Sequence, residues 1–196
     1  MINDVIDQLA GITPGSPLDR LRARRPVARE HAQRSFDALF TPDDDSEVTL
    51  VERDAIAAFV AGLHQDAEIA SFYADRLAEL SPGLLKAVVS EIEASGTTGP
   101  YGVYPDGGPL AKESDEGLRY RVRNPGDLGV RLAAAVEHAH LLVFRPREAR
   151  QDDLDALDRA GWSATAIVTL SQLVAFLTFQ IRVVAGLRLL RKGSDS

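Results

Sequence analysis

The stretch LVERDAIAAFVAGLHQDAEIASFYADRL, residues 50–77, carries the pattern of two successive amphipathic helices. Apolar side chains in its first half recur three and four positions apart, which places them on one face of a helix. These side chains are Ile56, Phe59, Val60 and Leu63. The second half repeats the spacing at Ile69, Phe72, Tyr73 and Leu77. The stretch therefore predicts a pair of packed helices.

Helix start signals recur along the rest of the chain. Thr49 and Glu52 have the spacing of a capping box, and Ser163 is placed to cap the last helix. A capping residue directly before Pro82 and before Pro125 marks two further starts. The predicted helices span residues 2–10, 26–40, 49–64, 66–80, 82–95, 127–144, 151–160 and 163–191. The predicted fold class is all-α.

Residues 96–126 interrupt the helical pattern with a long segment rich in glycine and proline. Loops of this length without regular structure are usually functional or disordered. Four apolar residues predict packing against the body instead of a disordered linker: Tyr101, Tyr104, Leu118 and Tyr120. We divide the chain into an N-terminal helical extension, residues 1–44, and one compact domain, residues 45–196, which contains this internal loop.

The bulk composition excludes several classes of function. The 196 residues include no cysteine, so disulfides, thiolate nucleophiles and thiolate metal sites are impossible. A formal net charge of −7 disfavours nucleic acid and anionic membranes as partners. The N-terminus lacks the basic start and apolar run of a signal peptide, which predicts a cytoplasmic protein. Residues 160–181 lack charged side chains, but their hydroxyl and amide groups favour a buried core helix over a membrane span.

Candidate catalytic residues begin in the first helix pair. Glu52 lies on the same side of its helix as the apolar stripe, so it is either a helix cap or a carboxylate kept for proton transfer. Tyr73 carries a hydroxyl into the predicted core, where a satisfied structural hydroxyl is the commoner outcome. His64, at the end of the first helix of the pair, adds an imidazole suited to acid–base work.

The sequence VEHAHLL, residues 136–142, holds a second candidate group. Glu137 and His140 are three apart and neighbours on a helix, so the carboxylate can orient the imidazole for general acid–base catalysis. His138 and His140 are two apart and diverge, which argues against a shared metal ion. The alternative is that His140, on an apolar stripe, is simply packed and hydrogen-bonded.

A third group consists of the arginines of LRYRVR, residues 118–123. In an extended backbone Arg119, Arg121 and Arg123 point to one side and can bind an anion or a carboxylate. A solvated charged segment is the alternative. The last helix also carries a polar line, at Thr165, Thr169, Gln172 and Gln180. Such a line borders a pocket, which makes Gln172 a candidate ligand contact, or it hydrogen-bonds to another subunit.

The segment DALDRAGWSATAIVTLSQLVAFLTFQIRVVAGL, residues 155–187, resembles the C-terminal helices of the carboxymuconolactone decarboxylase superfamily, which includes the alkylhydroperoxidase D-like and peroxidase-related proteins. Glu52–Arg53 and the small apolar helix after them are similar to the segment that precedes this family's Cys-x-x-Cys-x-x-x-His motif. The resemblance covers residues 45–190. It implies an alkylhydroperoxidase D-like helical domain that assembles as a homo-oligomer.

The resemblance also shows where this chain departs from the family. With Glu52–Arg53 on the family's Glu-Arg, the two cysteine positions fall at Asp66 and Ile69, and the motif histidine falls at Tyr73. The relay carboxylate falls at Asp54 or at Glu52 itself. In the peroxidase-like members the cysteines reduce the peroxide by thiolate attack and disulfide formation. Aspartate and isoleucine cannot do so, which excludes a thiol-based hydroperoxidase.

Three functions follow as expectations. The first is a thiol-independent acid–base enzyme, similar to the decarboxylase branch, acting on a small carboxylate-bearing molecule. Its candidate catalytic residues are Glu52, His64, Tyr73, Glu137 and His140, with Arg119, Arg121 and Gln172 in substrate binding. The alternative is a non-catalytic binding or partner subunit beside a cysteine-bearing paralogue. A peroxidase with a bound cofactor finds no ligand set in the sequence, so we expect no cofactor and no metal.

Overall fold

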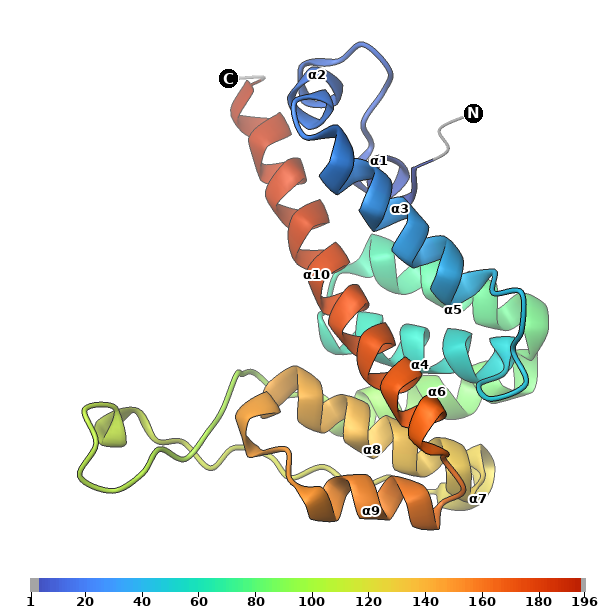
Figure 1. The fold of residues 1–196 in the computed structure, drawn as a ribbon, viewed down its shortest axis with the longest axis vertical. Helices are drawn as coiled ribbons and strands as arrows, with labels where there is room; N and C mark the ends of the chain where they lie inside the picture. Colours follow the sequence, from blue (N-terminus) through green and yellow to red (C-terminus); the bar gives the residue numbers. More distant parts are fainter. Residues whose placement is uncertain (1–3, 195–196) are drawn as a thin grey trace.

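The structure, a computed structural model, describes residues 4–194 and is all-α over that range, as predicted (Figure 1). The N-terminal helices are α1 (Val5–Ala10), α2 (Pro17–Ala23) and α3 (Pro26–Phe40). The central helices are α4 (Leu50–Leu63), α5 (Ala67–Leu80) and α6 (Pro82–Ser95). The C-terminal part contains η1 (Ala111–Glu113), α7 (Pro125–Leu128), α8 (Val130–Phe144), η2 (Pro146–Glu148), α9 (Gln151–Arg159) and α10 (Ala164–Ser194).

The predicted helix starts are confirmed where capping residues mark them. The Thr49 hydroxyl accepts a hydrogen bond from the Glu52 N–H at 3.2 Å, and the Glu52 carboxylate accepts one from the Thr49 N–H at 2.9 Å. This reciprocal pair is the predicted capping box. The Ser163 hydroxyl accepts a backbone N–H at the start of α10. Pro82 and Pro125 each occupy the first position of a helix, but the Ser81 and Asn124 side chains before them make no capping hydrogen bond.

The structure differs from the predicted boundaries at three places. Helix α2 escapes the prediction, although Ser16–Pro17 carries the same start signal as the later helices. The helix predicted over residues 127–144 is divided into α7 and α8 by Gly129, whose φ of 76° lies in the left-handed region that favours glycine. The helix predicted over residues 2–10 begins at Val5, and its residues 2 and 3 lie outside the described range.

Helix α10 forms the spine of the molecule. It runs through nearly the whole length and packs against α1, α2, α3, α4, α8 and α9 (Figure 1). Its inner face contributes fully buried side chains to the core, among them Leu170, Leu173, Leu177 and Val184. The N-terminal extension is tied to the same helix, because the Arg188 guanidinium donates to the Leu9 carbonyl at 2.6 Å. One helix therefore joins the extension to the compact domain.

Helix α10 is also the one element within residues 4–194 that has the length and hydropathy of a membrane span. In its most apolar window, 44% of the residues are buried inside the molecule, so this helix serves the core on one side and faces outward on the other. The core helix of a soluble protein passes the same test of length and composition. The structure is thus compatible with a soluble protein.

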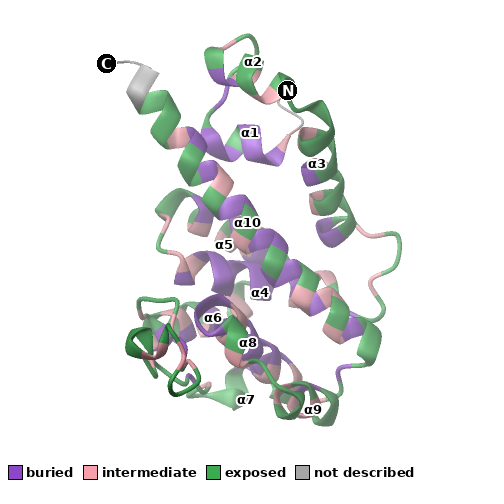
Figure 2. Cartoon of the chain, turned by 60° about the vertical axis from the view of Figure 1, so that its left-hand side comes forward, coloured by how far each residue is buried: buried purple, intermediate pink, exposed green. Residues whose placement is uncertain are grey.

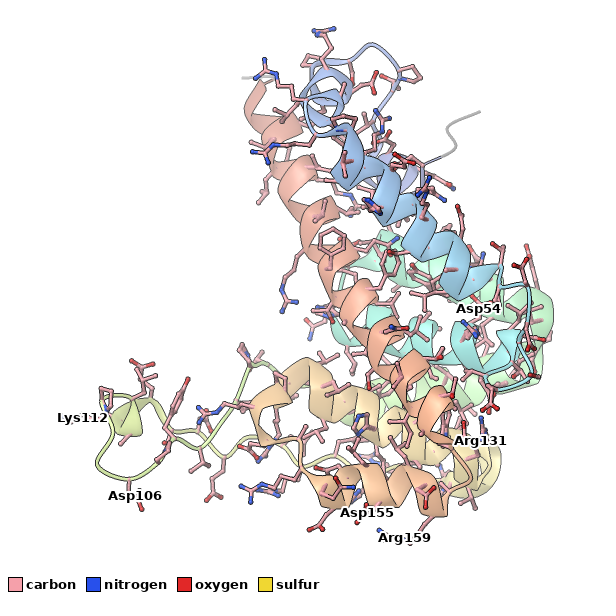
Figure 3. All side chains as sticks on the ribbon, in the orientation of Figure 1. Asp54, Asp106, Lys112, Arg131, Asp155 and Arg159 are labelled. Atoms are coloured by element: carbon pink, nitrogen blue, oxygen red, sulfur yellow. The ribbon has the colours of Figure 1, made fainter. Side chains whose placement is uncertain are left out.

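Residues 102–115 form an arm that projects from the body of the protein (Figure 1). An antiparallel bridge joins its first and last residues, and Figure 3 shows Asp106 and Lys112 at its far end. The expected packing of the loop is confirmed at Tyr120, which is buried. It is also confirmed at Tyr101, which packs against the core, but it is wrong at Leu118, which is exposed, and for the arm, which lies clear of the core because its Gly- and Pro-rich sequence offers few apolar anchors.

Candidate functional site

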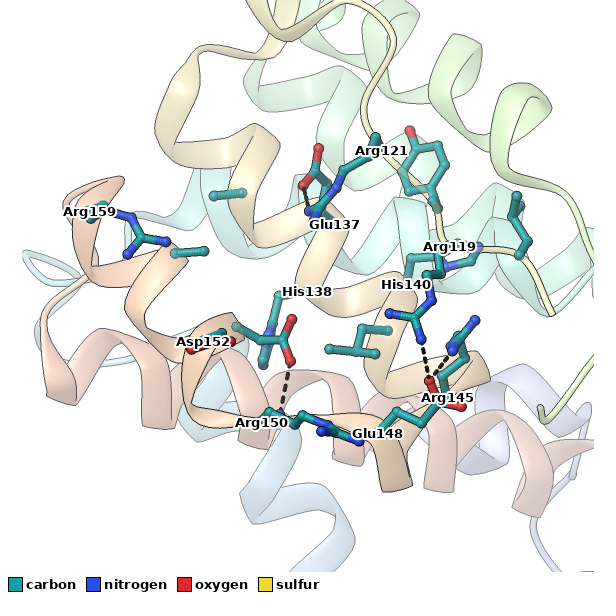
Figure 4. Close-up of a pocket in the computed structure, with 16 residues that line it drawn as sticks. Arg119, Arg121, Glu137, His138, His140, Arg145, Glu148, Arg150, Asp152 and Arg159 are labelled. Atoms are coloured by element: carbon teal, nitrogen blue, oxygen red, sulfur yellow. Dashed lines mark hydrogen bonds and ion pairs between the residues drawn. The ribbon is translucent and has the colours of Figure 1, made fainter. Parts of the chain in front are cut away.

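A pocket of about 540 Å³ lies between α8, α9 and the backbone segment 118–121. This volume is in the range of small-molecule sites. Its charged lining consists of Arg119, Arg121, Glu137, Arg145, Glu148, Arg150, Asp152, Asp153 and Arg159, together with His138 and His140. Figure 4 shows these side chains around a common space. The pocket unites four residues that the sequence predicted as site residues: Arg119, Arg121, Glu137 and His140.

His138 lies near the middle of this group in Figure 4. It shares one face of α8 with Ala134 and Leu141, four residues before and three after it, and α8 packs against α9. The side chain is 5% exposed, and its Nδ1 atom is buried without a hydrogen-bond partner among the described residues. Burial lowers the pKa of His138, and the Asp153 carboxylate opposes this effect only in part. The imidazole is therefore neutral at pH 7.

His140 is held more firmly than His138. Its Nε2 atom lies 3.2 Å from the carbonyl oxygen of Ser95, which accepts a hydrogen bond, so the Nε2 atom carries the proton and Nδ1 is left as a base. The ring packs between Tyr120 and Phe144, with centroid distances of 4.9 and 4.7 Å. Burial lowers the pKa of His140; the Ser95 hydrogen bond opposes this change and the charge of Arg145 adds to it.

The predicted pairing of Glu137 with His140 is wrong. The Glu137 carboxylate instead accepts hydrogen bonds from the Arg121 guanidinium and from the Val122 N–H, the second at 2.9 Å. Glu137 and His140 are three positions apart on α8, but Arg121 and Val122, in the segment that leads from the arm to α7, take the hydrogen bonds of the Glu137 carboxylate. Glu137 therefore fixes the wall of the pocket and does not orient the imidazole.

Arg145 organises the opposite end of the pocket. Its buried guanidinium donates to the Glu148 carboxylate and to the carbonyl oxygens of Glu116 and Gly117, which anchors the base of the arm. Arg119 reaches the same Glu148 carboxylate at 3.5 Å. Burial acts to raise the pKa of Glu148, but the hydrogen bond from Arg145 and further donors outweigh it, so the pKa is lowered. Glu148 is thus an ionised, fully engaged structural group.

Two guanidinium groups of the pocket remain without a carboxylate partner. Within residues 4–194, Arg119, Arg121 and Arg145 form ion pairs, whereas Arg150 and Arg159 form none. Both are exposed, and Figure 4 places Arg159 on one side of His138 and Arg150 below it. The neighbouring Asp153 carboxylate is occupied by the Arg150 backbone N–H at 2.9 Å, as a cap of α9. These two guanidiniums are available to an anionic ligand.

A buried carboxylate holds the pocket wall from behind. Glu91, on α6, accepts hydrogen bonds from the Tyr120 hydroxyl and from the backbone N–H groups of Arg123 and Asn124, the latter two at 3.1 Å. Burial acts to raise the pKa of Glu91, but these donors outweigh it and the pKa is lowered. Burial and the adjacent Glu91 raise the pKa of Tyr120, so its hydroxyl stays protonated. The ionised Glu91 carboxylate therefore holds the segment that contains Tyr120, Arg123 and Asn124, which forms this wall of the pocket.

Two of the remaining predicted site residues are structural. Glu52 combines its capping role with an ion pair to Arg131 at 2.7 Å, so the interpretation as a cap is confirmed. The Tyr73 hydroxyl donates to Gln180 Oε1 at 2.5 Å inside the core. Both side chains lie outside the lining of the pocket.

The last two predicted site residues are also outside the pocket. His64 ends α4, and its Nε2 atom is buried without a partner among the described residues. Burial and the positive charge of Arg182 lower its pKa. Gln172 is exposed on the outer face of α10 and does not border the pocket. The polar line on this helix is thus split between core and surface.

The positions that the family resemblance assigns to cysteines serve the architecture here. The Asp66 carboxylate caps α5 by accepting the Ile69 N–H at 3.1 Å, and it pairs with Arg188 at 2.7 Å. Ile69 is fully buried in the core. The expected relay carboxylate, Asp54, is buried and paired with Arg76 at 2.6 Å. Each of these residues has a structural partner of its own.

His138 was considered from the sequence only as a metal ligand, and the other charged groups of the pocket were not predicted: Arg145, Glu148, Arg150, Asp152, Asp153 and Arg159. A signal existed in RPREARQDD, residues 145–153, where charges of both signs crowd the short link between two helices. A group of charges of this size near an apolar helix end indicates a cleft only once α9 is known to fold back onto α8. That packing is a tertiary contact, which local spacing does not reveal.

A scan against protein-family models and a search of the curated proteins found no match to this chain. Among the described residues, no group of three or more His, Cys, Asp or Glu side chains is arranged to hold a metal ion. The geometry of the pocket therefore carries the functional assignment.

Proposed function

We propose that the pocket binds a small carboxylate-bearing molecule and transfers a proton to or from it without thiol chemistry. The observation that carries this proposal is the position of Arg150 and Arg159, two guanidiniums without carboxylate partners, beside the neutral imidazole of His138. A guanidinium binds a carboxylate through two parallel hydrogen bonds, which orients the ligand as well as attracting it. The two arginines would thus hold the ligand within reach of a base.

Two imidazoles supply candidate bases for the reaction. The lowered pKa values of His138 and His140 keep both rings neutral at pH 7, the state in which an imidazole accepts a proton. On His140 the free acceptor is Nδ1, since Nε2 is committed to Ser95. His138 lines the pocket and its ring makes no hydrogen bond among the described residues, whereas the Nε2 atom of His140 is committed to Ser95, which favours His138 as the group that responds to a bound ligand. Proton abstraction next to the carboxylate is the reaction class that these groups fit.

This proposal places the chain beside the thiol-independent decarboxylase branch of the superfamily that its sequence resembles. The absence of cysteine supports the restriction to acid–base chemistry. Of the catalytic candidates predicted from the sequence, only Glu137 and His140 line the pocket. Arg119, Arg121 and Glu137 shape its walls, and the proposed proton transfer no longer includes Glu52, His64 or Tyr73.

A second candidate function is a binding subunit that holds an anionic ligand without transforming it. The projecting arm and the open outer face of α10 favour this alternative, because both are surfaces that a partner protein can cover. In that case Arg150 and Arg159 keep their binding role, and the histidines are packed side chains.

Isothermal titration calorimetry with succinate, benzoate and muconate tests the binding step. We expect millimolar or tighter binding of at least one of these carboxylates, and a loss of tenfold or more in the double variant Arg150→Ala/Arg159→Ala. The matched control is Arg34→Ala, an exposed arginine on α3 that pairs with Glu30. Absence of binding for all three probes, or equal binding by the double variant, overturns the proposal.

Proton transfer is tested separately from binding. Exchange of the hydrogens next to the carboxylates of succinate for deuterium in D₂O, followed by NMR, detects proton abstraction even when no net product forms. We expect exchange with the wild-type protein, and its loss in His138→Gln with binding retained. Binding without any exchange assigns the pocket to the binding-subunit alternative.

A further inference from the structure

The outer face of α10 carries a regular seam of exposed residues. It consists of Thr165, Val168, Gln172, Ala175, Phe179, Arg182, Gly186 and Leu189, and all eight are exposed. Successive members are alternately three and four positions apart, a mean period of 3.5 residues. Figure 2 shows exposed residues recurring along the length of this helix. We call this set the α10 seam.

A 3.5-residue period is the hallmark of a helix that packs along another helix in a left-handed coiled coil. The spacing of the exposed positions follows from burial of the opposite face, where Leu170, Leu173 and Leu177 are fully buried, so the evidence for a partner is which side chains occupy the seam. On the seam, Val168, Phe179 and Leu189 remain 55%, 49% and 69% exposed. Large apolar side chains that are exposed along one helix face, here at intervals of ten or eleven residues, are candidates for an interaction surface.

We propose that two copies of this chain pair through the α10 seam in an antiparallel arrangement, with the two-fold axis level with Leu177. The seam is symmetric about that level in its spacing. Its eight positions therefore form eight facing layers over roughly 36 Å, at 1.5 Å of rise per residue.

Size complementarity supports the antiparallel register. In this register Phe179 of one copy faces Ala175 of the other, so the largest side chain of the seam meets a small one. Val168 likewise faces Gly186. Alternating large and small residues across facing positions is what close packing between two helices requires. The two central layers, both of the Phe179–Ala175 type, would bury the aromatic rings at the middle of the contact.

Polar complementarity points the same way. Two of the three polar members of the seam face each other, because Gln172 lies opposite Arg182 in the antiparallel register. The Gln172 side-chain oxygen can accept a hydrogen bond from the guanidinium. A parallel pair would instead place Arg182 against Arg182 and leave a gap where Gly186 meets Gly186. Like charges in contact and an unfilled gap both disfavour that arrangement.

A lipid bilayer fits the α10 seam less well than a second copy. A spanning helix needs an apolar surface on all sides, and a guanidinium near the bilayer centre is costly. Arg182 lies near the middle of α10, and it is exposed on the outer face of the helix. A polar pair in a protein–protein contact accommodates this residue, whereas acyl chains do not.

The oligomeric state is the first test. We expect light scattering after size exclusion, at tens of micromolar protein, to give twice the 21.2 kDa mass of the chain. Phe179→Glu should yield a monomer with an unchanged helical circular dichroism spectrum. Val27→Glu, at a valine that is 62% exposed on α3, is the matched control and should stay dimeric. A monomeric wild type, including one that sediments with lipid vesicles, overturns the proposal, as does a dimeric Phe179→Glu variant.

The register is tested by exchanging the facing residues. Ala175→Phe should weaken the dimer because two phenylalanines then compete for one layer, and Phe179→Ala should weaken it by leaving a gap. The double variant Ala175→Phe/Phe179→Ala moves each ring to the other side of the same layer, so it should recover most of the affinity. A double variant that is weaker than both single variants rules out the antiparallel pairing.

Disulfide trapping gives an independent readout, since the chain contains no cysteine that would interfere. A mixture of Ala175→Cys and Phe179→Cys proteins should form a cross-linked heterodimer under mild oxidation. Each variant alone should cross-link poorly, because identical positions lie too far apart in the antiparallel pair for disulfide geometry. Efficient cross-linking of each single variant would identify a parallel pair and overturn the register.

Discussion

The Tyr73 hydroxyl donates a hydrogen bond of 2.5 Å to the side-chain oxygen of Gln180, and this bond ties α5 to the spine helix in the fully buried core. Gln180 is already short of one partner, because its Nε2 atom is buried without a hydrogen bond among the described residues. The pair lies where the family resemblance places a catalytic histidine. In this protein the residue at that position, Tyr73, has a structural role, because its hydroxyl links α5 to α10.

Tyr73→Phe should therefore lower the free energy of unfolding by about 1–3 kcal/mol, because it leaves the Gln180 oxygen buried and unpaired as well. The double variant Tyr73→Phe/Gln180→Leu replaces both polar partners with apolar groups and should recover much of this loss. Urea denaturation followed by circular dichroism measures both values. A single variant as stable as the wild type would show that the bond contributes nothing.

Arg131 links three elements at the other end of the core, and we expect Arg131→Lys to destabilise the protein by about 1–3 kcal/mol. The guanidinium pairs with Glu52 at 2.7 Å, donates to the Glu47 carbonyl at 2.6 Å and stacks 4.3 Å from the ring centre of Trp162. A lysine ammonium keeps the charge but loses the planar geometry that serves these contacts together.

The single tryptophan of the chain, Trp162, reports this change directly through its fluorescence during urea unfolding. Arg34→Lys provides the control, because Arg34 is exposed and its ion pair with Glu30 is a surface pair. Equal unfolding midpoints for Arg131→Lys and Arg34→Lys would contradict the prediction.

The lowered pKa of Glu91 predicts a pH-dependent stability. A carboxyl whose pKa is lower in the folded state stabilises the protein above its unfolded value of 4.5, and this contribution is lost as the pH falls through the folded value. Glu91→Gln should thus be less stable than the wild type at pH 7. The difference should shrink steadily below about pH 4.5.

Free energies of unfolding measured from pH 3 to pH 7 test this prediction. Glu93→Gln, on the exposed side of the same helix, serves as the control and should show little difference from the wild type. A stability difference between wild type and Glu91→Gln that does not vary with pH would argue against an ionised Glu91 in the folded state.

Arg147 fastens the arm where it leaves the body. Its guanidinium lies 3.5 Å from the ring centre of Tyr104 and donates to the Val103 carbonyl at 2.8 Å. Arg147→Ala should expose Tyr104 and speed chymotryptic cleavage there several-fold, while the unfolding midpoint changes little because the site is at the surface. Mass spectrometry of the fragments identifies the bond that is cut. Arg34→Ala, far from the arm, should leave the cleavage rate at its wild-type value.

Local signals predicted the helices well because most of the starts are marked by side chains that act within one turn. Thr49, Glu52 and Ser163 make the capping contacts that their spacing indicates. The split at Gly129 was missed because a glycine within a helical pattern is also compatible with a continuous helix. Contacts between residues a few positions apart can therefore be predicted from one sequence.

The candidate site was only half predictable for the same reason. Arg119, Arg121, Glu137 and His140 were found from their types and spacing, and the fold brings them to one pocket. The partners of His140 and Arg119 were not found, because Ser95 and Glu148 are placed against them by tertiary packing. A charge run such as residues 145–153 becomes a pocket wall only when a second helix turns back against the first.

The dependence of the N-terminal helices on the spine has a consequence for synthesis of the chain. Arg188 binds the carbonyl of Leu9, 179 positions earlier, and Arg191 binds that of Ala10. A ribosome must therefore complete nearly all of the described chain before α1 meets α10, so α1 spends most of translation with only its contacts to α2 and α3 available. Until α10 is made, the apolar face of α1 is exposed and can be bound by chaperones that act on nascent chains.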